Sequence, residues 1–170
     1  MKEARVICTA SSHPTAGWVR RGFIAWPNGK NAKGDCGADA PLGNVPRYLD
    51  VAYDETATLF GLKASFFQAA LPVSIKASFR CSTESGELVE FTRLFMGYRY
   101  SPELLNILAR VLAGDPEMVL PQQAATKELK IHVWIDNIGI GGPHGTVQSW
   151  GRQIIHNMQG CGVTIGEQKF

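Results

Sequence analysis

Two short runs of alternating residues near the end of the chain constrain its fold more than any other feature. Between residues 129 and 135, leucine, isoleucine and valine alternate with lysine, histidine and tryptophan, and Ile138-Gly139-Ile140 resumes the pattern. Alternation with a period of two is typical of a strand with one buried face. The two residues between the runs, Asp136 and Asn137, predict a tight turn and therefore an antiparallel hairpin. Part of the core must then be built on an antiparallel sheet.

The remaining pattern predicts an α+β protein. A helix is expected from Ser101, a favourable N-cap followed by Pro102, to Gly114. Its buried face is predicted from the helical spacing of Leu104, Ile107, Leu108, Val111 and Leu112. A second helix is expected over residues 147–158, a hairpin over 77–91, and short strands at 22–26, 57–62 and 163–165. Strands, helix, hairpin, helix and strand follow one another without regular βαβ alternation, which favours a mainly antiparallel sheet.

Composition excludes several classes of protein. The chain has 170 residues and a formal net charge of +2, which is too weak to indicate nucleic-acid binding by itself. No apolar run approaches the roughly 20 residues of a membrane span, and residues 1–17 contain no secretory signal and are interpreted as a loose leader. We expect an intracellular protein, cytoplasmic or nuclear, with no membrane partner. Its four cysteines are spaced too widely for metal-binding pairs and are expected to be reduced thiols: Cys8, Cys36, Cys81 and Cys161.

The residues themselves offer few sites for chemistry. Asp136 at the hairpin tip would present a carboxylate to a metal or substrate, and His132 lies on the same side of the strand, although an acidic turn is also ordinary turn chemistry. The glycine-rich stretch 139–145 lacks both the dinucleotide-binding and the P-loop pattern and is interpreted as a flexible link. The histidines have no metal-binding spacing, and the serines lack a nucleophile elbow.

Taken in order, four segments resemble the fingers–palm part of a retroelement reverse transcriptase. They are residues 60–68 (first palm motif), 94–102 (similar to Leu-Pro-x-Gly-x-x-x-Ser-Pro), 134–137 (aromatic-x-Asp-Asp on a hairpin) and 161–169 (Gly-apolar-x-apolar…Lys). The resemblance covers residues 18–170. It implies a truncated α+β fold, an antiparallel palm sheet with helices packed on one face. Residues 1–17 are an unassigned leader, 18–56 partial fingers and 57–170 palm, with thumb and RNase H regions expected to be absent.

The resemblance also implies a catalytic site that has decayed. Reverse transcriptases hold two Mg²⁺ ions with one aspartate from the first palm motif and two from the hairpin. Here these positions are Gly61, Asp136 and Asn137, so only Asp136 remains as a catalytic and metal-binding carboxylate. Asp50 and Asp54 lie upstream of the motif. Mg²⁺ belongs to the ancestral activity, and we expect it not to be bound productively here.

Nucleotide-binding positions are implied by the same motifs. Phe66 matches the gate that excludes a ribose 2′ hydroxyl, and Gly97 matches a glycine at which the backbone approaches the nucleotide. Arginine forks suit a triphosphate, although a solvated fingers strand is the plain alternative, and Lys169 is either a motif-matched proton donor or a surface lysine. The full set is Arg20, Arg21, Phe66, Met96, Gly97 and Lys169.

Three functions remain open at this point. The first is a retrotransposon-type reverse transcriptase fragment whose ancestral activity was RNA-templated DNA synthesis and which is now inactive. The second is a non-catalytic nucleic-acid-binding module, and the third is a metal enzyme of another type that uses one carboxylate. The expected partners are an RNA or DNA template–primer, bound weakly if at all, and the remaining parts of a polymerase.

Overall fold

The computed structural model describes residues 5–11, 20–26, 31, 42, 45–82 and 86–169. For residues 5–11, 20–26, 45, 47, 82 and 167–169 only the backbone is described. The chain divides into two compact units. The first unit consists of the described residues up to 38 together with Ala69–Ser101, and the second consists of those from 39 to 68 together with 102–169.

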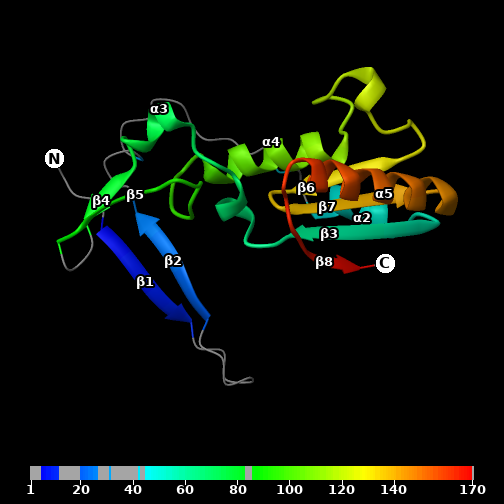
Figure 1. Ribbon diagram of the computed structural model, residues 1–170. Coiled ribbons are helices and arrows are strands. Elements are labelled where there is room, and N and C mark those ends of the chain that lie inside the picture. Colours follow the sequence, from blue (N-terminus) through cyan, green and yellow to red (C-terminus); the bar gives the residue numbers. More distant parts are fainter. Residues whose placement is uncertain are drawn as a thin grey trace. The chain divides into compact units, whose positions relative to one another are not determined.

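A four-stranded antiparallel sheet forms the centre of the second unit (Figure 1). Its strands are β6 (Lys130–Trp134), β7 (Asn137–Gly142), β3 (Thr56–Leu62) and β8 (Ile165–Lys169), in that order across the sheet. All three neighbouring pairs are antiparallel. The α+β class with an antiparallel sheet is thereby confirmed, while the last strand begins at Ile165 rather than at residue 163.

The main core lies between one face of this sheet and two helices, α4 (Ser101–Ala113) and α5 (His144–Gly160). Alternation along β3 turns Phe60 and Leu62 to this face, where Ile138 and Ile140 of β7 join them. Phe60, Ile138 and Ile140 are fully buried. In Figure 1, α5 runs over this side of the strands. Burial of large apolar side chains here provides the main stabilisation of the unit.

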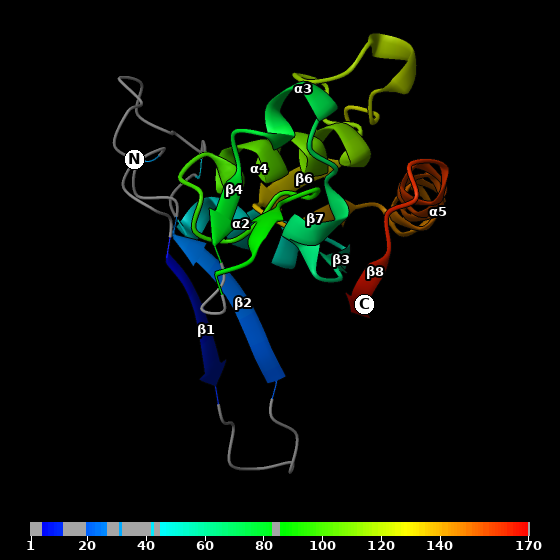
Figure 2. The ribbon, with the colours of Figure 1, turned by 60° about the vertical axis from the view of Figure 1, so that its left-hand side comes forward.

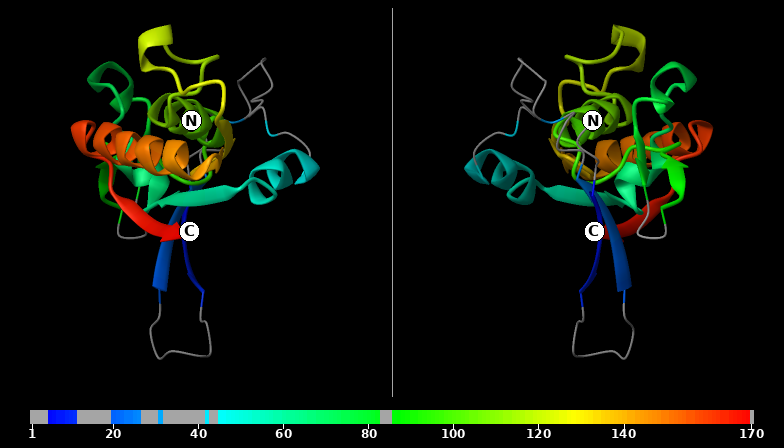
Figure 3. Two further views of the ribbon diagram at one scale, coloured as in Figure 1. Left: turned by 90° about the vertical axis from the view of Figure 1, so that its right-hand side faces the viewer. Right: turned by 90° about the vertical axis from the view of Figure 1, so that its left-hand side faces the viewer.

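Helix α2 (Val45–Ala52) lies on the opposite face of the sheet, which we call the open face (Figure 3). It fits closely because β7 carries glycine there. A Cβ atom on Gly141 would lie 2.7 Å from an oxygen of Asp54 and 3.0 Å from the carbonyl oxygen of Val51. The interpretation of residues 139–145 as a flexible link is therefore wrong. The glycines continue β7, and His144 begins α5.

The buried face of α4 also differs from the prediction. The helix has the expected limits, but Leu104, Ile107, Leu108 and Val111 are 37–44 % exposed. Of the predicted face only Leu112 is buried, and Leu105, Ala109 and Ala113 are buried with it. Both sides of α4 are apolar, so its periodicity did not distinguish the face that meets the sheet. The Ser101 hydroxyl donates a hydrogen bond to the Phe95 carbonyl oxygen (2.8 Å), a bond that the N-cap prediction did not include.

The first unit contains two small antiparallel hairpins (Figure 2). One pairs β1 (Arg5–Ser11) with β2 (Arg20–Trp26), and the other pairs β4 (Arg80–Ser82) with β5 (Leu88–Glu90). The second hairpin was predicted. The first shows that residues 5–11 form a strand rather than a loose leader; residues 1–4 and 12–17 lie outside the described ranges. A short helix, α3 (Val73–Lys76), lies between β3 and β4 in the chain.

Among the described side chains of the first unit, several aromatic rings pack together. Phe95 is 1 % exposed and stacks on Phe91 with ring centroids 4.2 Å apart, and Phe79 meets it edge-on at 5.5 Å. Cys81 is a free, buried thiol whose pKa is raised by desolvation, whereas Cys161 in the second unit is free and exposed. Cys8 and Cys36 lie where no side chains are described. Within the described ranges, no helix is long and apolar enough to cross a bilayer.

Candidate functional site

The hairpin tip is displaced by one residue from its predicted position. Ile135 and Asp136 form the two-residue loop, whereas Asn137 is the first residue of β7 and pairs with Trp134. Ile135 has φ 55°. Two-residue hairpin loops need positive φ at their first central position, which glycine usually occupies. A β-branched residue there is strained by about 1–3 kcal/mol, so the tip stores local strain beside the Asp136 carboxylate.

The register of β3 and β7 brings the three implied carboxylate positions together. Gly61 is the cross-strand partner of Asn137. The Leu62 N–H donates to the carbonyl oxygen of Asp136 at 3.1 Å, which fixes the loop against the end of β3. Since directly opposite residues of an antiparallel pair point to the same face, Gly61 and Asn137 both belong to the open face. On the other side of β3, Gly61 pairs with Glu167 of β8.

The chemistry of this site does not fit a pair of divalent cations. Gly61 supplies no ligand, and the Asn137 amide donates a hydrogen bond to the Asp136 carboxylate at 3.2 Å. Among the described residues, no group of three or more acidic, histidine or cysteine side chains is placed to hold a metal ion. Asp54 does not replace the missing groups, because it pairs with Lys130 at 3.1 Å and lies beside Gly141, at the other end of β7.

Phe66 lies in a short 3-10 helix, η1 (Ser65–Gln68), directly after β3. Its ring is half-buried and packs against the main core. Phe67, the next residue in the chain, is 39 % exposed. The side-chain amide of Gln68 donates to the carbonyl oxygens of Lys63 and Thr164 and accepts from the Thr164 N–H. Gln68 thus ties η1 to the segment that enters β8.

Ala64, at the junction of β3 and η1, is exposed and has φ 48°. We expect Ala64→Gly to raise the free energy of unfolding slightly. The relief of about 1–2 kcal/mol of left-handed strain exceeds the roughly 0.4–1 kcal/mol that glycine adds to unfolded-state entropy. Urea unfolding would measure it. The matched control is Ala77→Gly, at an exposed residue with φ −57°, which should lose about 0.5–1 kcal/mol. A loss in both variants would contradict the strain at Ala64.

The turn around Gly97 belongs to the first unit and is held by several hydrogen bonds. Gly97 has φ 98°. Its carbonyl oxygen accepts from the Asn31 side chain at 2.8 Å, and the Asn31 side chain accepts from the Arg99 N–H at 3.0 Å. Burial raises the pKa of Tyr98 in the same turn, and the neighbouring Tyr100 raises it further against the opposing effect of Arg99. Met96 is 42 % exposed. The hydrogen bonds from Asn31 thus link both sides of this turn.

The remaining predicted binding residues are placed through their backbones alone. Arg20 and Arg21 are the first residues of β2 and pair with Ser11 and Ala10. Lys169 is the last residue of β8 and pairs with Leu59. The structure therefore brings Gly61, Asp136 and Asn137 together in one unit, with Phe66 and the backbone of Lys169 in the same unit.

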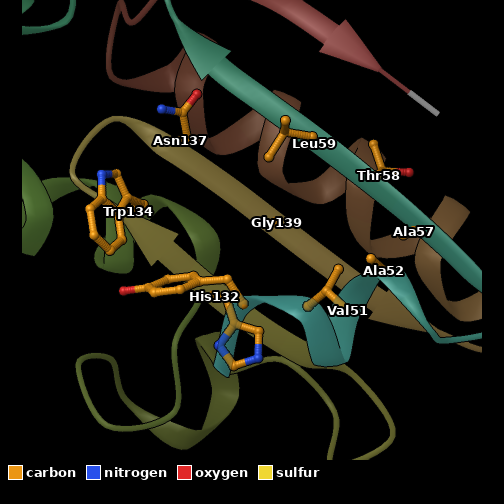
Figure 4. A pocket seen from close by; sticks show the side chains of 10 residues that line it. Val51, Ala52, Ala57, Thr58, Leu59, His132, Trp134, Asn137 and Gly139 are labelled. Carbon is orange, nitrogen blue, oxygen red and sulfur yellow. The ribbon is translucent and has the colours of Figure 1, made fainter. Parts of the chain in front are cut away.

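A hollow on the open face was missed by the sequence reasoning. It lies between α2 and the strands β3, β6 and β7 and has a volume of about 520 Å³ (Figure 4). Tyr48 of α2 meets Trp134 edge-on at 5.0 Å and His132 at 5.7 Å. Strand alternation predicts only that His132 lies on the same side of its strand as Asp136. No local sequence pattern indicated that Tyr48, which belongs to a helix far away in the sequence, would contact these two side chains.

Comparisons with known proteins identify the fold. No protein-family model matches the chain, and no curated protein matches its sequence. Among solved structures, the chain is similar to that of the foamy viral protease-reverse transcriptase dRH in complex with double-stranded DNA, with a TM-score of 0.69 and 13 % sequence identity. The match covers 95 % of this chain and 26 % of that chain, so this chain spans about a quarter of its length. The chain has a reverse-transcriptase-like fold.

Proposed function

We propose that this chain is a retrotransposon-type reverse transcriptase domain, comprising fingers and palm, that has lost nucleotidyl transfer. The ancestral reaction is RNA-templated DNA synthesis with two Mg²⁺ ions. One observation carries the proposal: Gly61 and Asn137 are cross-strand partners, and the backbone of Asp136 bonds to Leu62 beside them. The positions that supply three carboxylates in the family are thus adjacent, and only Asp136 retains one.

The loss of activity follows from metal-ligand chemistry. A hard cation such as Mg²⁺ prefers carboxylate oxygens, and glycine offers no side chain. Even the loss of groups that only orient metal ligands typically reduces affinity or activity about 10–100-fold. The loss of two direct ligands should therefore have a larger effect. The Asn137 amide also uses one Asp136 oxygen for its own hydrogen bond.

Primer extension tests this proposal. The unmodified chain is expected to give no Mg²⁺-dependent extension of a DNA primer on an RNA template. The double variant Gly61→Asp, Asn137→Asp is expected to bind Mg²⁺ at least about tenfold more tightly in calorimetric titration, a readout that needs no further polymerase domain. Any Mg²⁺-dependent extension by the unmodified chain would refute the proposed inactivity.

Two controls make the result specific. Asp136→Asn in the double variant should return Mg²⁺ affinity toward that of the unmodified chain. Glu167→Gln in the unmodified chain should have no effect on Mg²⁺ affinity, although β8 places this residue opposite Gly61. If the double variant binds Mg²⁺ no better than the unmodified chain, the assignment of Gly61 and Asn137 to the metal site is wrong.

A second candidate function is a non-catalytic nucleic-acid-binding module. It is supported by Trp134, which is 39 % exposed on the open face, because exposed aromatic rings stack on unpaired bases. The net charge of +2 opposes tight binding. We expect weak binding of template–primer with a shallow salt dependence. Submicromolar binding with a steep salt dependence would favour the module instead.

A further inference from the structure

The hollow on the open face extends from Asn137, one of the implied metal positions, along the strands and has chemistry of its own. Its floor is formed by β3 and β7, and one wall is formed by Tyr48 and Val51 of α2. In Figure 4, Asn137 and Trp134 lie at one end, and Val51 and Ala52 lie at the other. A volume of about 520 Å³ lies within the range of roughly 300–1,000 Å³ typical of small-molecule sites.

Small residues keep the hollow open. Gly139 lies in its floor, and a Cβ atom added there would meet its nearest neighbours at 3.7–3.9 Å, which is ordinary contact. An added methyl group would therefore fit beside Val51 and Leu59, whereas a larger side chain would extend into the hollow. Ala57, on the neighbouring strand, adds only a methyl group to the lining.

The lining selects an uncharged ligand. No Asp, Glu, Lys or Arg is found among the described residues that line the hollow. The nearby Lys130 is neutralised by its ion pair with Asp54 at 3.1 Å. A charged ligand would lose its hydration without gaining a partner of opposite charge, and such uncompensated burial is costly.

The shape and the remaining groups favour an aromatic ligand. Tyr48 packs edge-on against both Trp134 and His132, which leaves aromatic surface along one side of the hollow. Aromatic rings pair with one another through offset or edge-on contacts. The Asn137 amide supplies a hydrogen-bonding group at the rim, since its Nδ2 atom has one hydrogen beyond that used for Asp136.

We propose that this hollow binds a planar, uncharged aromatic small molecule, which packs over Gly139 against Tyr48 and Trp134 and hydrogen-bonds to Asn137. The proposed site shares Asn137 with the metal positions, but its apolar part, around Gly139, Tyr48 and Trp134, does not include Gly61 or Asp136. It also needs no nucleic acid.

A matched pair of probes tests the proposal on the full chain. The first is 2-naphthol, which is uncharged at neutral pH, and the second is 2-naphthoate, which has the same rings and a negative charge. We expect calorimetry to detect 2-naphthol and to show at least about tenfold weaker binding of 2-naphthoate. Equal affinity for the two probes would overturn the proposal.

Variants locate the binding site. Gly139→Leu fills the hollow and should abolish binding of 2-naphthol, and the milder Gly139→Ala should weaken it in the same direction. Leu108→Gln changes the exposed apolar side of α4 and should leave binding unchanged. Unchanged binding in folded Gly139→Ala and Gly139→Leu, or loss of binding in Leu108→Gln, would show that the probe binds elsewhere. Circular dichroism verifies the fold of each variant.

Discussion

Phe60→Ala should lower the free energy of unfolding by about 3–5 kcal/mol, the usual cost of deleting a buried phenylalanine ring. Phe60 is fully buried at the centre of β3, where its ring lies between the sheet and α5. A Cβ atom on Gly151 of α5 would lie 3.4 Å from the tip of this ring, so the ring packs directly against the helix backbone at a position without a side chain. Because folded proteins have only about 5–15 kcal/mol of stability, this loss should remove a large fraction of the free energy of unfolding.

Phe67→Ala is the matched control. Phe67 is 39 % exposed, and the same substitution there should cost well below half as much. Urea unfolding followed by circular dichroism would compare the two variants. Equal losses at the two positions would show that Phe60 is not the centre of this core.

Gly141→Ala is expected to have the second largest effect, a loss of about 1–3 kcal/mol from overpacking. The added Cβ would lie 3.0 Å from the Val51 carbonyl oxygen and 3.1 Å from its Cα. These are backbone atoms of α2, so the helix itself must move away from the sheet. The displacement should also separate Tyr48 from Trp134, which now lie 5.0 Å apart. Unfolding curves and tryptophan fluorescence would report the two effects independently.

Gly145→Ala provides a control of opposite sign. Gly145 lies in the first turn of α5, and nothing lies within 4 Å of an added Cβ. Alanine is favoured over glycine in helices by up to about 1 kcal/mol, so this variant should be slightly more stable. A stable Gly141→Ala with unchanged fluorescence would mean that α2 does not rest on β7.

The elements of the site could be predicted more fully than its arrangement. The motif order predicts that Gly61, Asp136 and Asn137 are positions of one site, and the register of β3 and β7 places Gly61 opposite Asn137. The exact turn was misplaced because Asp-Asn has better turn chemistry than Ile135-Asp136. The observed turn has a β-branched residue at φ 55°. The strain at Ile135 is offset because the Leu62 N–H donates a hydrogen bond to the loop and Ile135 packs against the core. Neither interaction is local in sequence.

The sequence by itself determined several elements of this protein, because helix and strand formation depend on local periodicity and on caps and turns. The hairpin of β6 and β7, helix α4 and the antiparallel class all follow from such patterns. Only the tertiary structure decided which side of each element is buried. Helix α4 offers Leu104 and Leu108 on one side and Leu105 and Leu112 on another, and contact with the sheet selects the second pair. The same is true of Gly139–Gly142, whose glycines have no local pattern of their own. The glycines of β7 matter because α2 packs on this strand. Whether the space left by a missing side chain is filled depends on the element that lies opposite the glycine.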